Sequence, residues 1–297
     1  MSTQKFLFGI LRVPFLILAP ACVLVGVGTA AWQTGNLNGW YVLLVFVGGL
    51  TAHITVNVFN EYYDFKSGLD TKTQRTPFSG GSGTLQANPA LARMTLAVAC
   101  LAFTITAVIG LFFVRMQGWQ LLLPGMVGLL LTVTYTIWWV KNPVLCLIAP
   151  GLGFGILMVM GTHFALTGTF SWNALIASFV PTFLVSNLLL LNQFPDVEAD
   201  LSVGRRHFPI TIGRKLSSRL FGAFYLLTYV TVVVGVVFRQ LPTFSLLALL
   251  TAVLAWRAAQ GVRKNAENVP ALIPSLGMNV IIVLVTPVLL AIGLMIG

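Results

Sequence analysis

The chain has 297 residues, of which 57% are hydrophobic and only 8% are charged, and its formal net charge is +10. A soluble domain carries about 25% charged residues, so this composition excludes a soluble globular protein and indicates an integral membrane protein. The three cysteines, Cys22, Cys100 and Cys146, stand singly in apolar runs, which excludes a disulfide framework or a zinc site.

Taken in chain order, the apolar runs that are long enough to cross a bilayer, which takes about 20 helical residues, predict nine transmembrane helices. These runs lie at 11–33, 40–62, 90–114, 119–140, 144–167, 172–194, 216–238, 241–260 and 271–296. They are too long for barrel strands, which alternate in polarity over about ten residues. We therefore expect an all-α integral membrane protein in which residues 1–297 form a single transmembrane domain. The first residues resemble no cleavable signal peptide.

The basic residues predict the orientation of these helices. With the N-terminus in the cytoplasm, 15 of the 17 Lys and Arg residues fall at inner helix ends or in inner loops, and only Arg115 and Arg239 fall outside. Positively charged loops stay in the cytoplasm, so we expect a cytoplasmic N-terminus and a C-terminus outside. Anionic lipid headgroups account for the positive net charge, and no nucleic-acid partner is needed to explain it.

The seven acidic residues are strongly clustered. Six of them lie in two short stretches, residues 57–70 and 192–200, each at the predicted cytoplasmic end of a helix. The first stretch contains NEYYD and the second contains NQFPD, so an Asn precedes an Asp by four residues in both. We refer to these stretches as motif 1 and motif 2.

Motif 1 has the spacing of one helix face. Asn57, Asn60, Glu61 and Asp64 follow the pattern i, i+3, i+4, i+7, and His53 lies one turn deeper on the same face. Because ionisable residues are costly in lipid, we expect this face to point into the helix bundle.

Motif 2 has a similar spacing but contains a proline. Asn192, Asp196 and Asp200 are four residues apart and share one face if the helix continues through Pro195. A proline there would remove a backbone hydrogen bond and kink or end the helix. In either case we expect the polar residues of motif 2 to face those of motif 1.

Carboxylates and carboxamides without paired His or Cys favour magnesium, which binds one or two carboxylates together with waters and substrate phosphates. Basic residues follow both motifs: Lys66, Lys72 and Arg75 follow motif 1, and Arg205 and Arg206 follow motif 2. Acids and bases interleaved at one membrane face predict a site for a magnesium–diphosphate. Surface ion pairing between the acids and the basic loops is the alternative, but it explains neither the repeated spacing nor the helical face.

These motifs resemble those of the UbiA-type intramembrane prenyltransferases, which carry NDxxDxxxD on helix 2 and DxxxD on helix 6. Asn60 and Asp64 match the first motif, with Glu61 in place of its usual second Asp, and Asp196 and Asp200 match the second. The resemblance implies that the two aspartate-rich motifs form one active site.

Further matches extend over the whole chain. Asp70 falls two residues beyond the usual third Asp, a spacing similar to that of the MenA-type branch, which prenylates 1,4-dihydroxy-2-naphthoate. GRRHFPITIG at 204–213 also resembles that branch, while LRVPFLILAP at 11–20 and YTIWWVK at 135–141 resemble family elements near helices 1 and 4. The loop RTPFSGGSGTL at 75–85 departs from the MenA-type pattern.

The resemblance implies a fold, a reaction and a location. The nine helices would enclose a central cavity open to the cytoplasmic side and to lipid, with the active site facing the cytoplasm of a cell inner membrane. The reaction would be the Mg²⁺-dependent transfer of a polyprenyl group from an allylic prenyl diphosphate to an aromatic acceptor. Two Mg²⁺ ions would be bridged by the diphosphate. The leading acceptor is 1,4-dihydroxy-2-naphthoate or a related quinone precursor, as in menaquinone biosynthesis.

The resemblance also implies roles for individual residues. The catalytic residues and metal ligands would be Asn60, Asp64, Asp196 and Asp200, with Glu61 and Asp70 as further metal candidates. The diphosphate contacts would be Arg12, Lys66, Lys72, Arg75, Tyr135, Lys141, Arg205 and Arg206. The candidates for acceptor binding are His53, Asn57 and Asn192. A bracing role for Asp70 and a packing role for His53 are equally compatible with the sequence.

Two alternatives remain open. Hydroxybenzoate, homogentisate, a haem, a chlorophyllide or a glycerol-phosphate lipid are the acceptors of other branches of the family. A cation-coupled transporter would also carry intramembrane acids and repeated motifs. The attached basic residues and the position of the acids at the cytoplasmic helix ends favour the enzyme.

Overall fold

The structure is a computed structural model that describes residues 3–73, 76 and 81–297. These residues form helices and turns, with no strand among them. The α-helices are α1 (Thr3–Leu11), α2 (Leu18–Thr34), α3 (Gly39–Ser67), α4 (Thr84–Ala87), α5 (Ala92–Gln117), α6 (Leu122–Thr134), α7 (Pro143–Gly151), α8 (Met158–Thr167), α9 (Trp172–Asn192), α10 (Val197–Ser202), α11 (Phe208–Thr211), α12 (Gly213–Val237), α13 (Ala252–Asn265) and α14 (Val269–Ile296).

Shorter helical stretches connect or extend these helices. The 3-10 stretches are Val13–Phe15, Leu69–Thr71, Pro89–Leu91, Trp119–Leu121, Trp139–Lys141 and Thr243–Thr251, and Leu152–Leu157 forms a π-helix between α7 and α8. Asparagine and serine caps begin several of the long helices. The side chain of Asn38, for example, accepts hydrogen bonds from the N–H groups of Trp40 and Tyr41 at the start of α3.

Eight helical segments of the described chain are long and apolar enough to cross a membrane. They are Val13–Thr34, Gly39–Ser67, Pro89–Gln117, Pro143–Thr167, Trp172–Asn192, Gly213–Val237, Thr243–Asn265 and Val269–Ile296. Each agrees within a few residues with a span predicted from the sequence, so the chain is an all-helical integral membrane protein. The remaining predicted span, 119–140, contains a shorter apolar helix, Trp119–Thr134.

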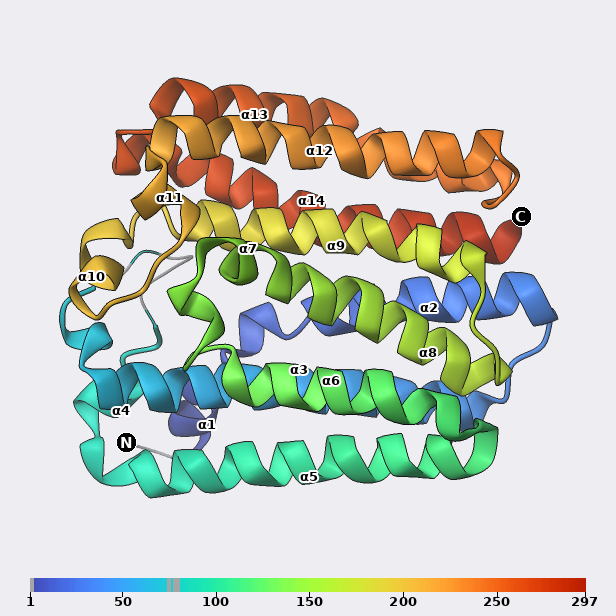
Figure 1. The fold of residues 1–297 in the computed structure, drawn as a ribbon, viewed down its shortest axis with the longest axis horizontal. Coiled ribbons are helices and arrows are strands. Elements are labelled where there is room, and N and C mark those ends of the chain that lie inside the picture. Colours follow the sequence, from blue (N-terminus) through green and yellow to red (C-terminus); the bar gives the residue numbers. More distant parts are fainter. Residues whose placement is uncertain (1–2, 74–75, 77–80) are drawn as a thin grey trace.

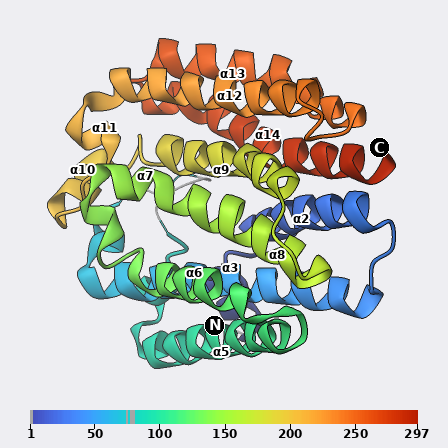
Figure 2. The ribbon, with the colours of Figure 1, turned by 45° about the vertical axis from the view of Figure 1, so that its right-hand side comes forward.

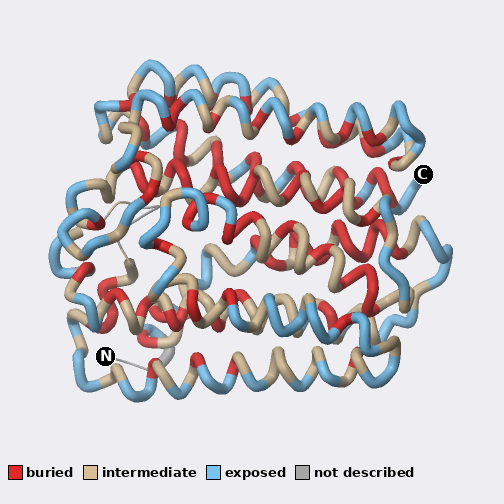
Figure 3. Tube along the Cα trace, in the orientation of Figure 1, coloured by how far each residue is buried: buried red, intermediate tan, exposed pale blue. Residues whose placement is uncertain are grey.

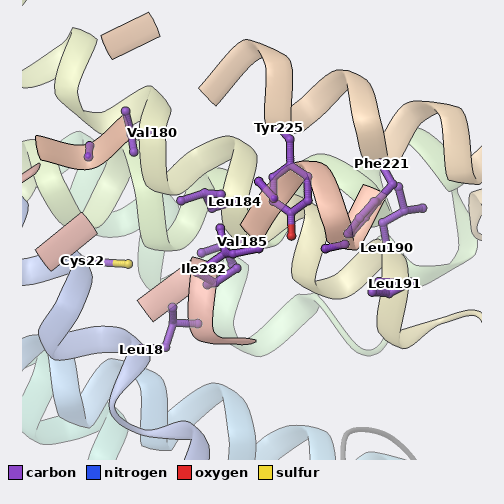
Figure 4. Close-up of a cluster of buried hydrophobic side chains, with 14 of the residues drawn as sticks. Leu18, Cys22, Val180, Leu184, Val185, Leu190, Leu191, Phe221, Tyr225 and Ile282 are labelled. Carbon is purple, nitrogen blue, oxygen red and sulfur yellow. The ribbon is translucent and has the colours of Figure 1, made fainter. Parts of the chain in front are cut away.

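The helices pack with α9 and α14 at the centre. Figure 1 shows α12 and α13 along one edge of the molecule and α5 along the opposite edge, and Figure 3 shows the many buried residues of α9 and α14. The largest buried cluster joins α9 to α2, α12 and α14. Figure 4 shows its residues Leu18, Cys22, Val180, Leu184, Val185, Leu190, Leu191, Phe221, Tyr225 and Ile282. This cluster fixes the position of the end of α9, where motif 2 begins.

Both motifs lie at one end of the bundle. The C-terminal end of α3 carries motif 1, and α10 carries the end of motif 2; in Figures 1 and 2 these elements and α11 lie at the same end, while the chain's C-terminus lies at the other. The predicted approach of the two motifs is therefore observed.

Candidate active site

Motif 1 lies on a continuous helix. α3 extends to Ser67 and ends at Gly68, whose φ of 74° is the left-handed conformation that favours glycine at a helix end. Asn57, Asn60 and Asp64 therefore share one helix face, as the spacing predicts, and all three border the same cavity.

The two asparagines of motif 1 are held by neighbouring segments. Asn57 Nδ2 donates a hydrogen bond to the carbonyl oxygen of Leu11, 3.2 Å away, and Asn60 Nδ2 donates to Thr136 Oγ1 at 3.3 Å. Their amide oxygens are not used in these bonds. The carboxamides are thus oriented by the segments before α2 and after α6.

Motif 2 is broken by its proline. α9 ends at Asn192, Pro195 lies in a turn, and Asp196 stands at the start of α10. The face that a continuous helix would have formed is absent, because the proline ends the helix. The separate helix α10 brings Asp200 to the same cavity as Asp196, and the Asp200 N–H donates to the Asp196 carbonyl oxygen at 2.8 Å.

Arg205 joins the two motifs. Its Nη2 donates to Asp64 Oδ1 and its Nη1 lies 3.2 Å from Asp200 Oδ1. His207 Nε2 lies 3.1 Å from the other carboxylate oxygen of Asp200. Burial disfavours the charged guanidinium, but the carboxylates of Asp64 and Asp200 outweigh it, so the pKa of Arg205 is raised above its usual value. This end of the bundle therefore holds a permanent cation between two carboxylates.

A cavity of about 730 Å³ extends from these acids into the bundle. Its polarity changes in the same direction along both principal helices. Along α3 the lining residues are Val45, Gly48 and Gly49, then His53 and Asn57, then Asn60 and Asp64. Along α9 they are Val185, Leu188 and Leu189, then Asn192 and Gln193, followed by Asp196 and Asp200. The cavity is thus acidic at one end, polar in between and apolar along the rest.

The π-helix shapes one wall of this cavity. Phe154 lies within it, borders the cavity, and packs edge-to-face against His53 with ring centroids 4.7 Å apart. A side chain at Gly151 or Gly155 would overlap Thr182 of α9, so these glycines allow the close approach of the two helices. π-Helical turns are frequent at functional sites.

Glu61 is turned away from the cavity. Its side chain is fully buried and does not border the cavity. Glu61 Oε2 accepts from Arg12 Nη2 at 3.1 Å and from the N–H of Ser82 at 3.3 Å, and the Ser82 hydroxyl binds Glu61 Oε1. Ser82 in turn contacts Thr84 Oγ1 at 2.8 Å. Glu61 therefore connects the segment before α2 with the segment that begins α4.

Comparisons with known proteins explain this arrangement. A family model described as the UbiA prenyltransferase family matches residues 19–274. The chain belongs to this family. The resemblance inferred from the motifs is thus confirmed, and with it membership of a family of prenyl-transferring enzymes.

Two relatives of the UbiA chain have naphthalene-derived acceptors in their names. The 1,4-dihydroxy-2-naphthoate octaprenyltransferase of Bacillus subtilis is 28% identical over 201 residues, which are 64% of this chain and 62% of that protein, less than two thirds of either. The 2-carboxy-1,4-naphthoquinone phytyltransferase of a Synechocystis strain is 25% identical over 271 residues, which are 88% of this chain and 83% of that protein.

A solved structure shows the same fold. It is that of a UbiA homologue from Archaeoglobus fulgidus bound to DMAPP and Mg²⁺. The comparison covers 98% of this chain and 99% of that chain, with a TM-score of 0.64 and 13% identity.

Three of the predicted diphosphate contacts border the cavity of this UbiA chain: Arg12, Tyr135 and Arg205. The Tyr135 hydroxyl lies 3.8 Å from Cys146 Sγ, which also borders the cavity. Four others, Lys66, Lys72, Lys141 and Arg206, are exposed and do not border it. Arg75 lies outside the described residues, and so does the side chain of Asp70.

The donor set of the site fits magnesium held together with a substrate. Among the described residues, no three Asp, Glu, His or Cys side chains are grouped so that they could hold one ion by themselves. Mg²⁺ usually takes one or two carboxylates and completes its coordination with waters and substrate phosphates. Asp64, Asp196 and Asp200 border the same end of the cavity and supply carboxylate oxygens from both motifs.

Several residues of the site have no signal in the sequence. His207 contacts Asp200 because the chain reverses at Gly204, whose φ is 79°. Gln193 borders the cavity and donates to Cys146 Sγ at 3.2 Å. Ser82 is brought to Glu61 by a loop. None of these contacts follows a helical spacing, and each depends on tertiary packing.

Proposed function

We propose that this chain catalyses the Mg²⁺-dependent transfer of a polyprenyl group from an allylic prenyl diphosphate to 1,4-dihydroxy-2-naphthoate or a related quinone precursor. Family membership, the naphthalene-derived acceptors named for two relatives, and the DMAPP and Mg²⁺ bound by the A. fulgidus homologue support this reaction. In this proposal two Mg²⁺ ions would be held, together with the substrate diphosphate, by Asn60, Asp64, Asp196 and Asp200.

The polarity of the cavity is the observation that carries this proposal. An allylic prenyl diphosphate has a polyanionic head and a long apolar tail, and the cavity has a charged end and an apolar length in the same order. The head binds at Asp64, Asp196 and Asp200 through metal ions. The tail extends past Gly48 and Gly49 between the helices, where its burial is favourable.

The charged end stabilises the leaving group. Bound Mg²⁺ supplies Lewis-acid stabilisation of the negative charge on the departing diphosphate. The side chains that border the cavity include those of Arg12, Tyr135 and Arg205. Their guanidinium and hydroxyl groups would donate hydrogen bonds to diphosphate oxygens. Hydrogen-bond donors directed at the leaving group stabilise the negative charge that develops on it.

The polar middle of the cavity binds the acceptor. His53, Asn57 and Asn192 border the cavity between the acids and the apolar end. His53 Nδ1 and Asn192 Oδ1 are buried and have no hydrogen-bond partner among the described residues. A ring with hydroxyl and carboxylate groups satisfies both atoms, and the ring of Phe154 adds an aromatic wall that attracts the allylic cation.

The same proposal includes the topology. Helix Trp119–Thr134 crosses the membrane in addition to the eight longer spans, which makes nine. Residues 1–297 form one prenyltransferase domain, and the active-site end of the bundle faces the cytoplasm. The Lys and Arg residues at that end support this orientation. The N-terminus is then cytoplasmic and the C-terminus outside, in the inner membrane of the cell. The cavity opens to the cytoplasmic side for the acceptor and to lipid for the tail.

A transfer assay tests the reaction. Protein purified in detergent receives radiolabelled geranylgeranyl diphosphate, Mg²⁺ and 1,4-dihydroxy-2-naphthoate, with EDTA in a parallel sample. We expect a labelled, prenylated product that forms only with Mg²⁺. A panel with hydroxybenzoate and homogentisate identifies the acceptor, and the absence of product with every acceptor would contradict the proposal.

Variants test the site. Asp64→Asn and Asp196→Asn preserve side-chain size but remove a carboxylate charge, and we expect turnover to fall at least about 100-fold. Glu198→Gln is the matched control, because Glu198 belongs to motif 2 but is 74% exposed and pairs with Arg214. It should change turnover less than about twofold.

A further inference from the structure

Arg205 is the only described side chain shown to bridge a carboxylate of motif 1 and a carboxylate of motif 2. The side chain of Arg205 is 17% exposed, and those of Asp64 and Asp200 are 8% and 6% exposed. The main chain supports this position, because the Arg205 N–H donates to the Asp200 carbonyl oxygen at 3.0 Å after the reversal at Gly204. The bridge is therefore a built feature of the site.

The bridged oxygens belong to the carboxylates that the proposed function assigns to Mg²⁺. Arginine remains protonated over the whole physiological pH range. A divalent cation that approaches Asp64 and Asp200 therefore meets a fixed positive charge already bound to both. Arg205 and a metal ion compete for the same two carboxylates.

We propose that Arg205 is an internal counter-ion that holds Asp64 and Asp200 until a diphosphate arrives. The guanidinium group then moves to the diphosphate oxygens, which it pairs with in a bidentate manner, and the carboxylates become available to Mg²⁺. This inference rests on the proposed function, because it takes Asp64 and Asp200 as metal ligands. It makes metal binding and diphosphate binding mutually dependent, and such coupling is reciprocal.

Two further observations support the exchange. His207 Nε2 lies 3.1 Å from Asp200 Oδ2, the oxygen that Arg205 does not contact, so Asp200 keeps its orientation when the guanidinium group leaves. The described residues contain no group of three ligating side chains that would bind an ion without help from phosphate oxygens. Both features suit a metal that enters together with its anion.

The test measures Mn²⁺ binding by equilibrium dialysis of the purified full chain in detergent, without and with saturating inorganic diphosphate. The concentrations of manganese and phosphorus are measured on both sides of the dialysis membrane. Arg205→Gln is compared with Arg219→Gln, which removes the same charge from an exposed residue of α12. We expect Arg205→Gln to tighten the binding of Mn²⁺ alone by about tenfold, and Arg219→Gln to change it by less than about twofold.

Diphosphate provides the second readout. It should increase the Mn²⁺ affinity of the wild-type chain by about tenfold or more, and that of Arg205→Gln by much less. Turnover at saturating Mg²⁺ should still fall in Arg205→Gln, because the diphosphate loses a donor. If Arg205 only stabilised the fold, Arg205→Gln would instead lower the melting temperature, and the binding of Mn²⁺ alone would be weaker or unchanged.

Equal Mn²⁺ affinities of the wild-type chain and Arg205→Gln would overturn the inference and leave the proposed function intact. No Mn²⁺ binding to the wild-type chain, with or without diphosphate, would overturn both. If Arg205→Gln does not fold, Arg205→Met replaces it, because methionine keeps a long unbranched side chain but removes the charge. Unchanged binding of Mn²⁺ alone in that variant would also refute the inference.

Discussion

Replacement of Glu61 distinguishes between two roles for this residue: a metal ligand, or a buried residue that connects two segments of the chain. The family resemblance makes Glu61 a candidate ligand, whereas the structure has its carboxylate fully buried and in contact with Arg12 and Ser82. Glu61→Ala removes the partner of a largely buried arginine. Breaking a buried pair in this way costs about 3–5 kcal/mol, and because 23% of the Arg12 side chain is exposed, water compensates in part, to about 2–3 kcal/mol.

Glu61→Gln is the milder change. Its amide oxygen still accepts a hydrogen bond from the Ser82 N–H, so the cost is about 1–2 kcal/mol for the lost charge. For a chain of this size each kcal/mol corresponds to roughly 2–4 °C in melting temperature. We therefore expect the order wild type, Glu61→Gln, Glu61→Ala in decreasing thermal stability. The largest shift should be about 4–12 °C by the same relation.

The assay combines thermal unfolding in detergent with the Mg²⁺ dependence of turnover. Because Glu61 does not border the cavity, the Mg²⁺ concentration for half-maximal turnover should remain within about twofold in Glu61→Gln, as it should in the exposed control Glu198→Gln. A tenfold or larger increase in that concentration with an unchanged melting temperature would show that Glu61 is a metal ligand. The reasoning from its contacts would then be refuted.

Three other substitutions test the cavity and its surroundings. A side chain at Gly161 would point into open space in the cavity wall. Gly161→Leu should therefore lower the ratio of kcat/KM for geranylgeranyl diphosphate to kcat/KM for dimethylallyl diphosphate about tenfold. Gly222→Leu, at an equally open position that does not border the cavity, should leave this ratio unchanged. Gly155→Ala would overlap the backbone of Thr182, cost about 1–3 kcal/mol and lower the melting temperature, and an unchanged value would contradict the packing. His207→Ala should weaken Mn²⁺ binding in the presence of inorganic diphosphate by about tenfold, measured by dialysis, whereas equal binding would show that the histidine does not orient its carboxylate.

The helical spans were predictable because their length is imposed by the bilayer. Eight of the nine predicted runs correspond to helices long enough to cross it. In lipid, the backbone N–H and C=O groups of an apolar run of about 20 residues can hydrogen-bond only with one another, which requires a helix. The run at 119–140 was less informative. Its α-helical part ends at Thr134 and is followed by turns and by the 3-10 stretch Trp139–Lys141. Hydropathy does not distinguish an apolar helix from an apolar turn that packs against it.

Local spacing predicted one motif better than the other. The pattern of Asn57, Asn60 and Asp64 follows directly from the helical period, and these residues do border one cavity. In motif 2 the sequence allowed the helix either to continue through Pro195 with a kink or to end. The structure shows that α9 ends before this proline. A separate short helix then carries Asp200 to the cavity, a result of tertiary packing that no local period encodes.

Of the cationic residues that follow the motifs in sequence, Arg205 borders the cavity and Lys66 does not. Lys66 follows motif 1 closely, but α3 turns its side chain to the surface, where its ammonium group lies 5.9 Å from the ring centroid of Tyr62. Arg205, by contrast, reaches Asp64 across 141 positions of the chain. This contact depends on the packing of the loop after α10 against the end of α3, so no spacing in the sequence predicts it.

The position of the acids along the helices has a physical origin. A carboxylate near the middle of a bilayer is costly, yet the reaction proposed for this chain requires charge beside an apolar tail. A cavity that runs along α3 and α9 satisfies both requirements, because Asp64 and Asp200 occur at the bundle end while Gly48 and Leu188 line the apolar length. The two acids also come from opposite halves of the chain and meet through Arg205. The proposed binding site is therefore complete only when both halves are packed, so ligands that bind it should stabilise the whole bundle.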